Sequence, residues 1–213
     1  MVNSERMTTF MNSFHCGNGE FLDKLRKQAI LDNVPIIRQE TENLLKVLLR
    51  LCEPKHILEV GTAIGYSALL MCDSMPEDAH ITTIEKYEKR IPIAKENFEK
   101  ARKKEKITLL EGDAKEILSK LTGEFEFVFM DAAKAQYLFY LPEITRLVPI
   151  GGILVSDNVL QDGEVIESRY LVERRNRTIH ARMREYLYEL THTREWETSI
   201  IPIGDGMTIS VRC

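Results

Sequence analysis

A glycine-rich turn preceded by a carboxylate is the first feature of this chain whose residue types suggest chemistry. The segment HILEVGTAIG, residues 56–65, is an apolar run with Glu59 near its end, followed by Gly61 and Gly65. A buried strand that leads into such a turn and a helix presents backbone N–H groups to nucleotide-like ligands. The spacing matches neither a dinucleotide fingerprint nor a phosphate loop. Glu59 would repel a pyrophosphate but attract an ammonium, such as that of the methionine part of S-adenosylmethionine. The alternative is an ordinary turn after a buried strand.

Two further acids follow the next two apolar segments, ITTIEK and LLEGDA. Glu85 closes the first of them, where a carboxylate can accept hydrogen bonds from both hydroxyls of a ribose. Asp113 closes the second, where it and the N–H of Ala114 can meet an adenine. A single acid of this kind is more often a solvated loop residue. Several of them at the ends of consecutive strands predict a cofactor that contains a nucleoside.

Oxygen-bearing side chains follow two more apolar segments. FVFMD ends at Asp131, and ILVSDN ends at Asp157 and Asn158. Two carboxylates and an amide oxygen at one sheet edge suit Mg²⁺, which favours oxygen ligands. Taken singly, Asp131 could cap the next helix, and Asp157-Asn158 could form a turn. Lys134 is a candidate general base for an acceptor hydroxyl, and a solvated lysine is the alternative.

These residues require a sheet that brings the ends of its strands together, and the chain alternates as such a sheet demands. Strands are expected at residues 56–60, 80–85, 107–110, 125–130 and 151–156, and helices at 35–51, 64–73, 89–104, 114–121, 136–148 and 172–191. Two β-rich segments near the C-terminus, joined by Gly-Asp-Gly, indicate a hairpin. The pattern predicts an α/β fold with a mostly parallel sheet, helices on both of its faces and an antiparallel C-terminal hairpin.

Length and composition suit one domain. We expect a helical N-terminal arm over residues 1–33 and a catalytic core over 34–213. Hydrophobic residues make up 44% of the chain and charged residues 29%, as in a globular protein. No apolar run approaches the roughly 18 residues of a membrane helix, and no secretory signal is recognised, so a cytoplasmic location is expected. The four scattered cysteines are interpreted as free thiols. The net charge of −4 gives no overall sign of nucleic-acid binding.

In combination, the motifs closely resemble those of the magnesium-dependent O-methyltransferases of the catechol and caffeoyl-coenzyme A type. The resemblance rests on ILEVGTAIGYSALLM, Glu85, GDA, MDAAKAQY and VSDNVL, and it covers about residues 34–213. It implies a Rossmann-like class I methyltransferase fold with a seven-stranded sheet, and a homodimer. The metal ligands that it implies are Asp131, Asp157 and Asn158, with Asp131 and Lys134 in catalytic roles. The contacts to S-adenosylmethionine that it implies are Ile37, Glu59, Gly61, Ser67, Glu85, Asp113, Ala114 and Asp131.

An arginine-rich segment follows the predicted metal ligands and bears on the acceptor. On a helix, Arg174, Arg177 and Arg184 would share one flank, with Arg175 beside them. Such a flank suits phosphates, although runs of charge are more often solvated helix faces. Within the family, the segments NVPI, DNVL, RRNRT and IIPIGDGMTIS resemble bacterial tRNA 5-hydroxyuridine methyltransferases. That branch implies the tRNA anticodon stem-loop as acceptor, with 5-methoxyuridine formed at the wobble position.

Two other functions remain as alternatives at this point. One is a methyltransferase for a small catechol or phenylpropanoid. The same metal site could serve this acceptor and the tRNA, because the 5-hydroxyl and 4-carbonyl of the uridine can chelate a metal as two adjacent catechol oxygens do. The other is a catalytically silent RNA-binding protein on a methyltransferase scaffold. The intact segments around Asp131 and Asp157 disfavour the silent protein.

Overall fold

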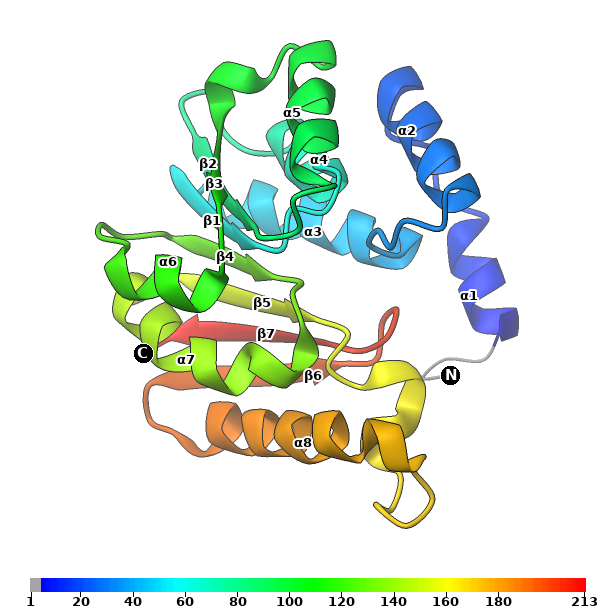
Figure 1. Ribbon diagram of the computed structural model, residues 1–213, viewed down its shortest axis with the longest axis vertical. Coiled ribbons are helices and arrows are strands. Elements are labelled where there is room, and N and C mark those ends of the chain that lie inside the picture. Colours follow the sequence, from blue (N-terminus) through cyan, green and yellow to red (C-terminus); the bar gives the residue numbers. More distant parts are fainter. Residues whose placement is uncertain (1–4) are drawn as a thin grey trace.

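A seven-stranded sheet with the order β3-β2-β1-β4-β5-β7-β6 forms the centre of the computed structural model, which describes residues 5–213 (Figure 1). The strands are β1 (His56–Val60), β2 (His80–Glu85), β3 (Ile107–Glu111), β4 (Phe127–Met130), β5 (Ile153–Asp157), β6 (Trp196–Ile201) and β7 (Met207–Arg212). The first five pair in parallel, whereas β7 is antiparallel to both β5 and β6. The predicted seven-stranded, mostly parallel sheet with an antiparallel C-terminal pair is therefore confirmed.

Helices cover both faces of the sheet, and each face has its own apolar core. One face packs against α3 (Gln39–Cys52), α4 (Tyr66–Cys72) and α5 (Ile91–Lys100), and the other against α6 (Ala114–Lys120), α7 (Tyr137–Leu147) and α8 (Arg177–His192) (Figure 1). The central strands β1 and β4 are buried between these layers because both of their faces are covered. This arrangement leaves the carboxyl ends of the parallel strands as the edge at which side chains can meet a ligand.

The N-terminal arm consists of α1 (Glu5–Asn12) and α2 (Glu20–Leu31). Its residues 1–4 lie outside the described part of the chain. Leu22 and Ala29 of α2 are buried in the core that α3, α4 and α5 share, whereas α1 buries none of its residues. The arm therefore belongs to one face of the sheet, on the side of the glycine-rich turn.

Two predicted helix starts are wrong. The helix expected from residue 35 begins at Gln39, because Val34 precedes a proline and the chain stays extended as far as Arg38, at φ −70° and ψ 154°. The helix expected from residue 172 begins at Arg177, after a short 3-10 turn, η4 (Arg174–Asn176). Another 3-10 segment, η3 (Gln161–Ile166), follows the predicted metal ligands where no element was expected.

The structure also bears on two compositional expectations. None of the helices in residues 5–213 is long and apolar enough to cross a membrane. All four cysteines are free thiols, as predicted.

Candidate active site

A cavity of about 310 Å³ opens at the carboxyl edge of the sheet, where the predicted cofactor residues were expected. Its wall combines the extended segment 35–37, the glycine-rich turn and the ends of β1, β2 and β4. The predicted cofactor residues that line it are Ile37, Gly61, Ser67, Glu85, Ala114 and Asp131. Glu59 and Asp113 lie next to lining residues but do not line the cavity themselves.

The glycine-rich turn is in backbone contact with the end of β4. Gly61 has a φ of +108°, and a Cβ at this position would lie 2.0 Å from the carbonyl oxygen of Asp131. The backbone N–H of Asp131 donates to the carbonyl of Val60 at 3.0 Å. Only glycine fits such an approach without a shift of the backbone. The turn that lines the cavity and the first predicted metal ligand are thus fixed against each other.

Glu59 lies fully buried behind this turn and acts on the cavity through its neighbours. Its carboxylate accepts hydrogen bonds from the hydroxyls of Ser67 and Thr83, each at 2.5 Å. Burial raises the pKa of Glu59 to about 7, and the two hydroxyl bonds offset part of that rise. Ser67 lines the cavity, so the carboxylate is one side chain away from a bound ligand.

Glu85 and Asp113 are held by different kinds of contact. The Glu85 carboxylate lines the cavity and accepts backbone N–H bonds from Ala63 at 2.7 Å and Tyr87 at 2.8 Å. The Asp113 carboxylate instead caps α6 by accepting from the N–H of Lys115 at 2.9 Å, and this backbone bond lowers its pKa. Of the two residues expected beside an adenine, Ala114 lines the cavity, whereas Asp113 fixes the start of the helix.

The three predicted metal ligands come together at the ends of β4 and β5. Asp157 is the last residue of β5 and is buried; its Oδ1 accepts from the N–H of Asn158 at 2.7 Å, while its Oδ2 is buried without a hydrogen-bond partner among the described residues. Burial, together with the nearby Asp131 carboxylate, raises the pKa of Asp157 to about 8. A buried carboxylate oxygen without a partner, beside a second carboxylate and an amide, fits a hard cation.

Of the two alternative interpretations, the structure excludes the cap and contains the turn: the N–H of Gln161 donates to the carbonyl of Asn158 at 3.3 Å, so a turn begins directly after Asp157. Asp131 caps no helix, since the next helical turn is preceded by Ala133 and has no side-chain cap. Within residues 5–213, no group of three or more His, Cys, Asp and Glu side chains is arranged to hold a metal, so a cation here needs the amide of Asn158. Lys134 Nζ lies 3.3 Å from Asp131 Oδ1 and lines the cavity.

Tyr137 is a positioning residue whose role was not predicted from the sequence. Its hydroxyl lies 3.0 Å from the carbonyl oxygens of both Met130 and Asp157, so it joins the ends of β4 and β5. The ring is fully buried, which leaves no face for stacking on a nucleobase. Tyr140 lies nearby and does line the cavity.

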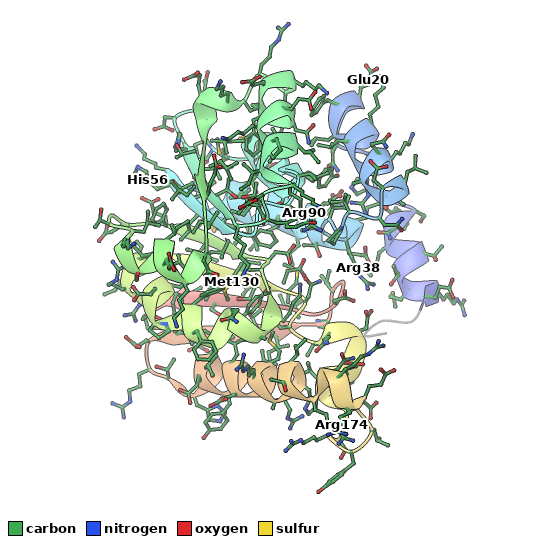
Figure 2. The ribbon with its side chains drawn as sticks, viewed as in Figure 1. Glu20, Arg38, His56, Arg90, Met130 and Arg174 are labelled. Carbon is green, nitrogen blue, oxygen red and sulfur yellow. The ribbon has the colours of Figure 1, made fainter. Side chains whose placement is uncertain are left out.

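The predicted arginine flank is largely committed to the protein itself. Arg177 Nε donates to the carbonyl of Val172 at 3.1 Å, and Arg184 Nη1 donates to that of Val165 at 2.9 Å. Arg175 pairs with Glu173 at 2.8 Å, and Arg174 is exposed at the start of η4 with no ion pair among the described residues. In Figure 2, Arg174 lies far from Arg90, which lines the cavity. Arg177 and Arg184 therefore hold the segment 160–173 against α8 through these backbone carbonyls.

A buried ionic cluster ties the N-terminal arm to the cavity wall. Glu42 is fully buried in α3; it accepts from the hydroxyl of Tyr66 at 2.7 Å and from Nδ2 of Asn18 at 2.7 Å, and it pairs with Arg26. Arg26 also donates to the carbonyl of Ile37 at 3.0 Å. Both Tyr66 and Ile37 line the cavity, so the arm supports one side of the cofactor site.

The strand order, the cavity at the carboxyl edge and the acids around its turn define a class I methyltransferase with S-adenosylmethionine as methyl donor. The O-methyltransferase family model matches residues 12–213, and the chain belongs to that family.

Individual relatives agree with this assignment. A caffeoyl-CoA O-methyltransferase of Populus kitakamiensis is 35% identical over 174 residues, which cover 79% of this chain and 74% of the relative. A Staphylococcus aureus crystal structure assigned as a caffeoyl-CoA O-methyltransferase superposes with a TM-score of 0.91 at 30% identity, covering 98% of this chain and 100% of the other. A Podospora anserina methyltransferase with S-adenosylhomocysteine bound gives a TM-score of 0.88 at 25% identity, covering 98% and 94% of the two chains. The chain is therefore an S-adenosylmethionine-dependent O-methyltransferase of the caffeoyl-CoA and catechol type.

Proposed function

We propose that this chain methylates one of two neighbouring oxygens on a small catechol-like acceptor, with a divalent metal held by Asp131, Asp157 and Asn158. The observation that carries the metal is the buried Oδ2 of Asp157, which has no hydrogen-bond partner among the described residues. A catechol presents two adjacent oxygens that can chelate one cation. The Populus relative, named for caffeoyl-CoA, supports an acceptor of this class.

Each part of the site has a distinct task in this proposal. Methyl transfer needs the acceptor oxygen in line with the sulfonium. The close backbone approach of Gly61 to Asp131 supports such an alignment, because it holds the proposed donor turn beside a proposed metal ligand. Bound Mg²⁺ supplies a Lewis acid that lowers the pKa of an acceptor hydroxyl. Lys134, 3.3 Å from Asp131, is the side chain placed to receive the proton of that hydroxyl.

The test is methyl transfer from labelled S-adenosylmethionine to a panel of catechols. We expect turnover with Mg²⁺, loss of turnover with EDTA and recovery on addition of Mg²⁺. Asp157→Asn removes the charge of the buried ligand and should abolish metal-dependent turnover, whereas Lys134→Met should lower the rate and leave metal binding intact. Absence of metal-dependent transfer to every hydroxylated acceptor, tRNA included, would favour the silent RNA-binding protein.

A second acceptor, the wobble 5-hydroxyuridine of tRNA, is supported by one surface feature. Arg169, Arg174 and Arg175 are exposed on or beside a segment that also exposes Tyr170 and Leu171, so cationic side chains lie near one exposed aromatic ring there. Arg174→Ala combined with Arg175→Ala should weaken tRNA binding and flatten its salt dependence without changing cofactor affinity. Mass spectrometry of tRNA from cells lacking the protein distinguishes the two acceptors. Loss of 5-methoxyuridine would favour tRNA, and unchanged tRNA would favour the small acceptor.

We also infer that the protein works as a homodimer through its N-terminal helices. Phe10 and Phe14 of the α1 region are 61% and 69% exposed, and Val47 and Leu51 of α3 are 54% and 75% exposed. Because α1 contacts α3, these side chains give the arm an apolar outer surface of the kind that marks an interface. Phe10→Glu should convert a dimer into a monomer in light scattering, and a wild-type monomer would refute the assignment.

A further inference from the structure

Three charged residues hold the segment that follows the predicted metal ligands, and none of them has a part in the chemistry above. Arg38 Nη2 lies 2.8 Å from Asp162 Oδ1 and also pairs with Asp205. The three residues belong to the start of α3, to η3 and to the β6–β7 turn. Figure 2 shows Arg38 beside the tip of that turn. We name Arg38, Asp162 and Asp205 the clasp.

The clasp reaches a metal ligand through Asp205. Nδ2 of Asn158 donates to Asp205 Oδ2 at 3.4 Å, and the N–H of Leu160 donates to the Asp205 carbonyl at 2.9 Å. The amide of Asn158 has its nitrogen and oxygen on opposite sides of one planar group. A carboxylate on the nitrogen side therefore leaves Oδ1 directed away from Asp205 and available to a cation.

Asp205 is only 17% exposed, so its own charge needs compensation, which Arg38 provides. The loop that the clasp holds is also unusual in its backbone. Asn158, Gln161 and Asp162 have φ values of 58°, 47° and 53°. Side chains in this left-handed region persist where surrounding contacts hold them, and the pairing of Asp162 with Arg38 is such a contact.

The other end of Arg38 belongs to the cofactor side of the site. It directly follows Pro35, Ile36 and Ile37, all of which line the cavity. The backbone of Arg38 therefore continues the cavity wall formed by residues 35–37, and its side chain contacts the loop after the predicted metal ligands. A shift of the segment 35–37 on donor binding would be transmitted to Asp205 and from there to Asn158.

We propose that Arg38 and Asp205 are positioning residues that orient the amide of Asn158 toward the divalent cation and couple cation binding to methyl-donor binding. This inference rests on the proposed metal site. The clasp touches neither reacting atom, so its contribution lies in the affinity for the cation and in the linkage between the two ligands. By thermodynamic reciprocity, a donor that strengthens cation binding is itself bound more strongly when the cation is present.

The test measures Mn²⁺ binding by the paramagnetic resonance of the free ion, without acceptor and therefore without turnover. We expect Asp205→Ala to raise the Mn²⁺ dissociation constant by about tenfold or more, the range typical of residues that orient a metal ligand. Arg38→Met should have a similar effect, and Arg38→Lys an intermediate one, because an ammonium cannot bind two carboxylates in the geometry of a guanidinium. Arg50→Met is the matched control on the same helix, since Arg50 donates to the carbonyl of Asp73 instead.

Linkage separates a positioning role from a merely structural one. In the wild type, saturating S-adenosylhomocysteine should tighten Mn²⁺ binding by about fivefold or more, and in Arg38→Met this ratio should fall close to one. A variant that is only less stable would melt at a lower temperature but keep the ratio of its Mn²⁺ dissociation constants without and with S-adenosylhomocysteine. Folded Arg38→Met and Asp205→Ala proteins that bind Mn²⁺ like the wild type would overturn the inference. Equal Mn²⁺ binding by the wild type and Asp157→Asn would instead overturn the metal site itself.

Discussion

Replacing Glu59 with glutamine should stabilise the ligand-free protein in a strongly pH-dependent way. The carboxylate is fully buried, and burial raises its pKa from 4.5 to about 7. At about 1.36 kcal/mol per pKa unit, this rise corresponds to a cost of about 3 kcal/mol for keeping the group ionised in the fold. Glutamine carries no charge and keeps the shape, but its single amide oxygen can accept from only one of the two hydroxyls of Ser67 and Thr83, which donate to different oxygens of Glu59.

The sign follows from proton linkage. A carboxyl whose folded pKa is raised contributes stability below its unfolded pKa, and this contribution is lost as the pH rises through the folded value. At pH 5 most of the cost is absent, and at pH 8 all of it is present. The free energy of unfolding of Glu59→Gln, relative to the wild type, should therefore increase by about 2–3 kcal/mol between pH 5 and pH 8.

Urea unfolding at the two pH values measures this difference. Glu111→Gln is the control, because Glu111 is 49% exposed and paired with Lys95 at the surface. The free energy of unfolding of this variant, relative to the wild type, should differ little between the two pH values. A Glu59→Gln difference that stays constant between pH 5 and pH 8 would refute the assignment of a raised pKa to burial. The variant should also bind S-adenosylmethionine more weakly, because Glu59 holds the hydroxyl of Ser67, which lines the cavity.

Three further substitutions test the supports of the site. Gly61→Ala should weaken S-adenosylhomocysteine binding at least about tenfold in calorimetry, because its Cβ would lie 2.0 Å from the carbonyl oxygen of Asp131, directly after β4. Gly123→Ala is the control, since Gly123 also has a positive φ but a Cβ there would have nothing within 4 Å, and this variant should bind with the affinity of the wild type. Tyr137→Phe removes the hydroxyl that joins the ends of β4 and β5 and should cost about 1–2 kcal/mol in urea unfolding; an unchanged midpoint would contradict that role. Glu42→Gln leaves the charge of Arg26 unbalanced beside a buried site and should lower the free energy of unfolding in urea by about 2 kcal/mol. A decrease below about 0.5 kcal/mol would mean that the ionic cluster around Glu42 does not stabilise the fold.

The fold and the location of the site were predictable because they follow from short-range patterns. Alternating apolar strands and amphipathic helices predict a parallel sheet, and acids placed after those strands meet at one edge by geometry alone. This reasoning located Glu85, Asp131 and Asp157 correctly at the carboxyl edge. It did not distinguish the carboxylate of Asp113, which caps a helix, from those that line the cavity, because both patterns place an acid just before a helix.

The supporting contacts were not predictable, because they join residues distant in sequence. Glu42 meets Tyr66 across 24 positions, and Arg38 meets Asp162 across 124. Each of these residues alone matches a solvated charge on a helix or loop, so composition and periodicity carry no signal for the pairing. The start of α3 was misplaced for a related reason: the segment 35–37 is apolar because it lines the cavity, and a buried helix has the same composition.

The close approach of Gly61 to the Asp131 carbonyl has a consequence for changing the selectivity of this enzyme. Because the contact is made by backbone atoms, substitutions of the surrounding side chains leave the spacing between the glycine-rich turn and Asp131 in place, and only a side chain at Gly61 itself would force the two apart. If the acceptor is the proposed catechol, the choice between its two oxygens is then left to the segments around the cavity that are free to vary, and the loop 158–173 after the predicted metal ligands is the candidate for this role. Directed evolution toward new acceptors should therefore draw its useful mutations from that loop, and grafting it between relatives should transfer substrate preference while the methyl-donor half stays unchanged.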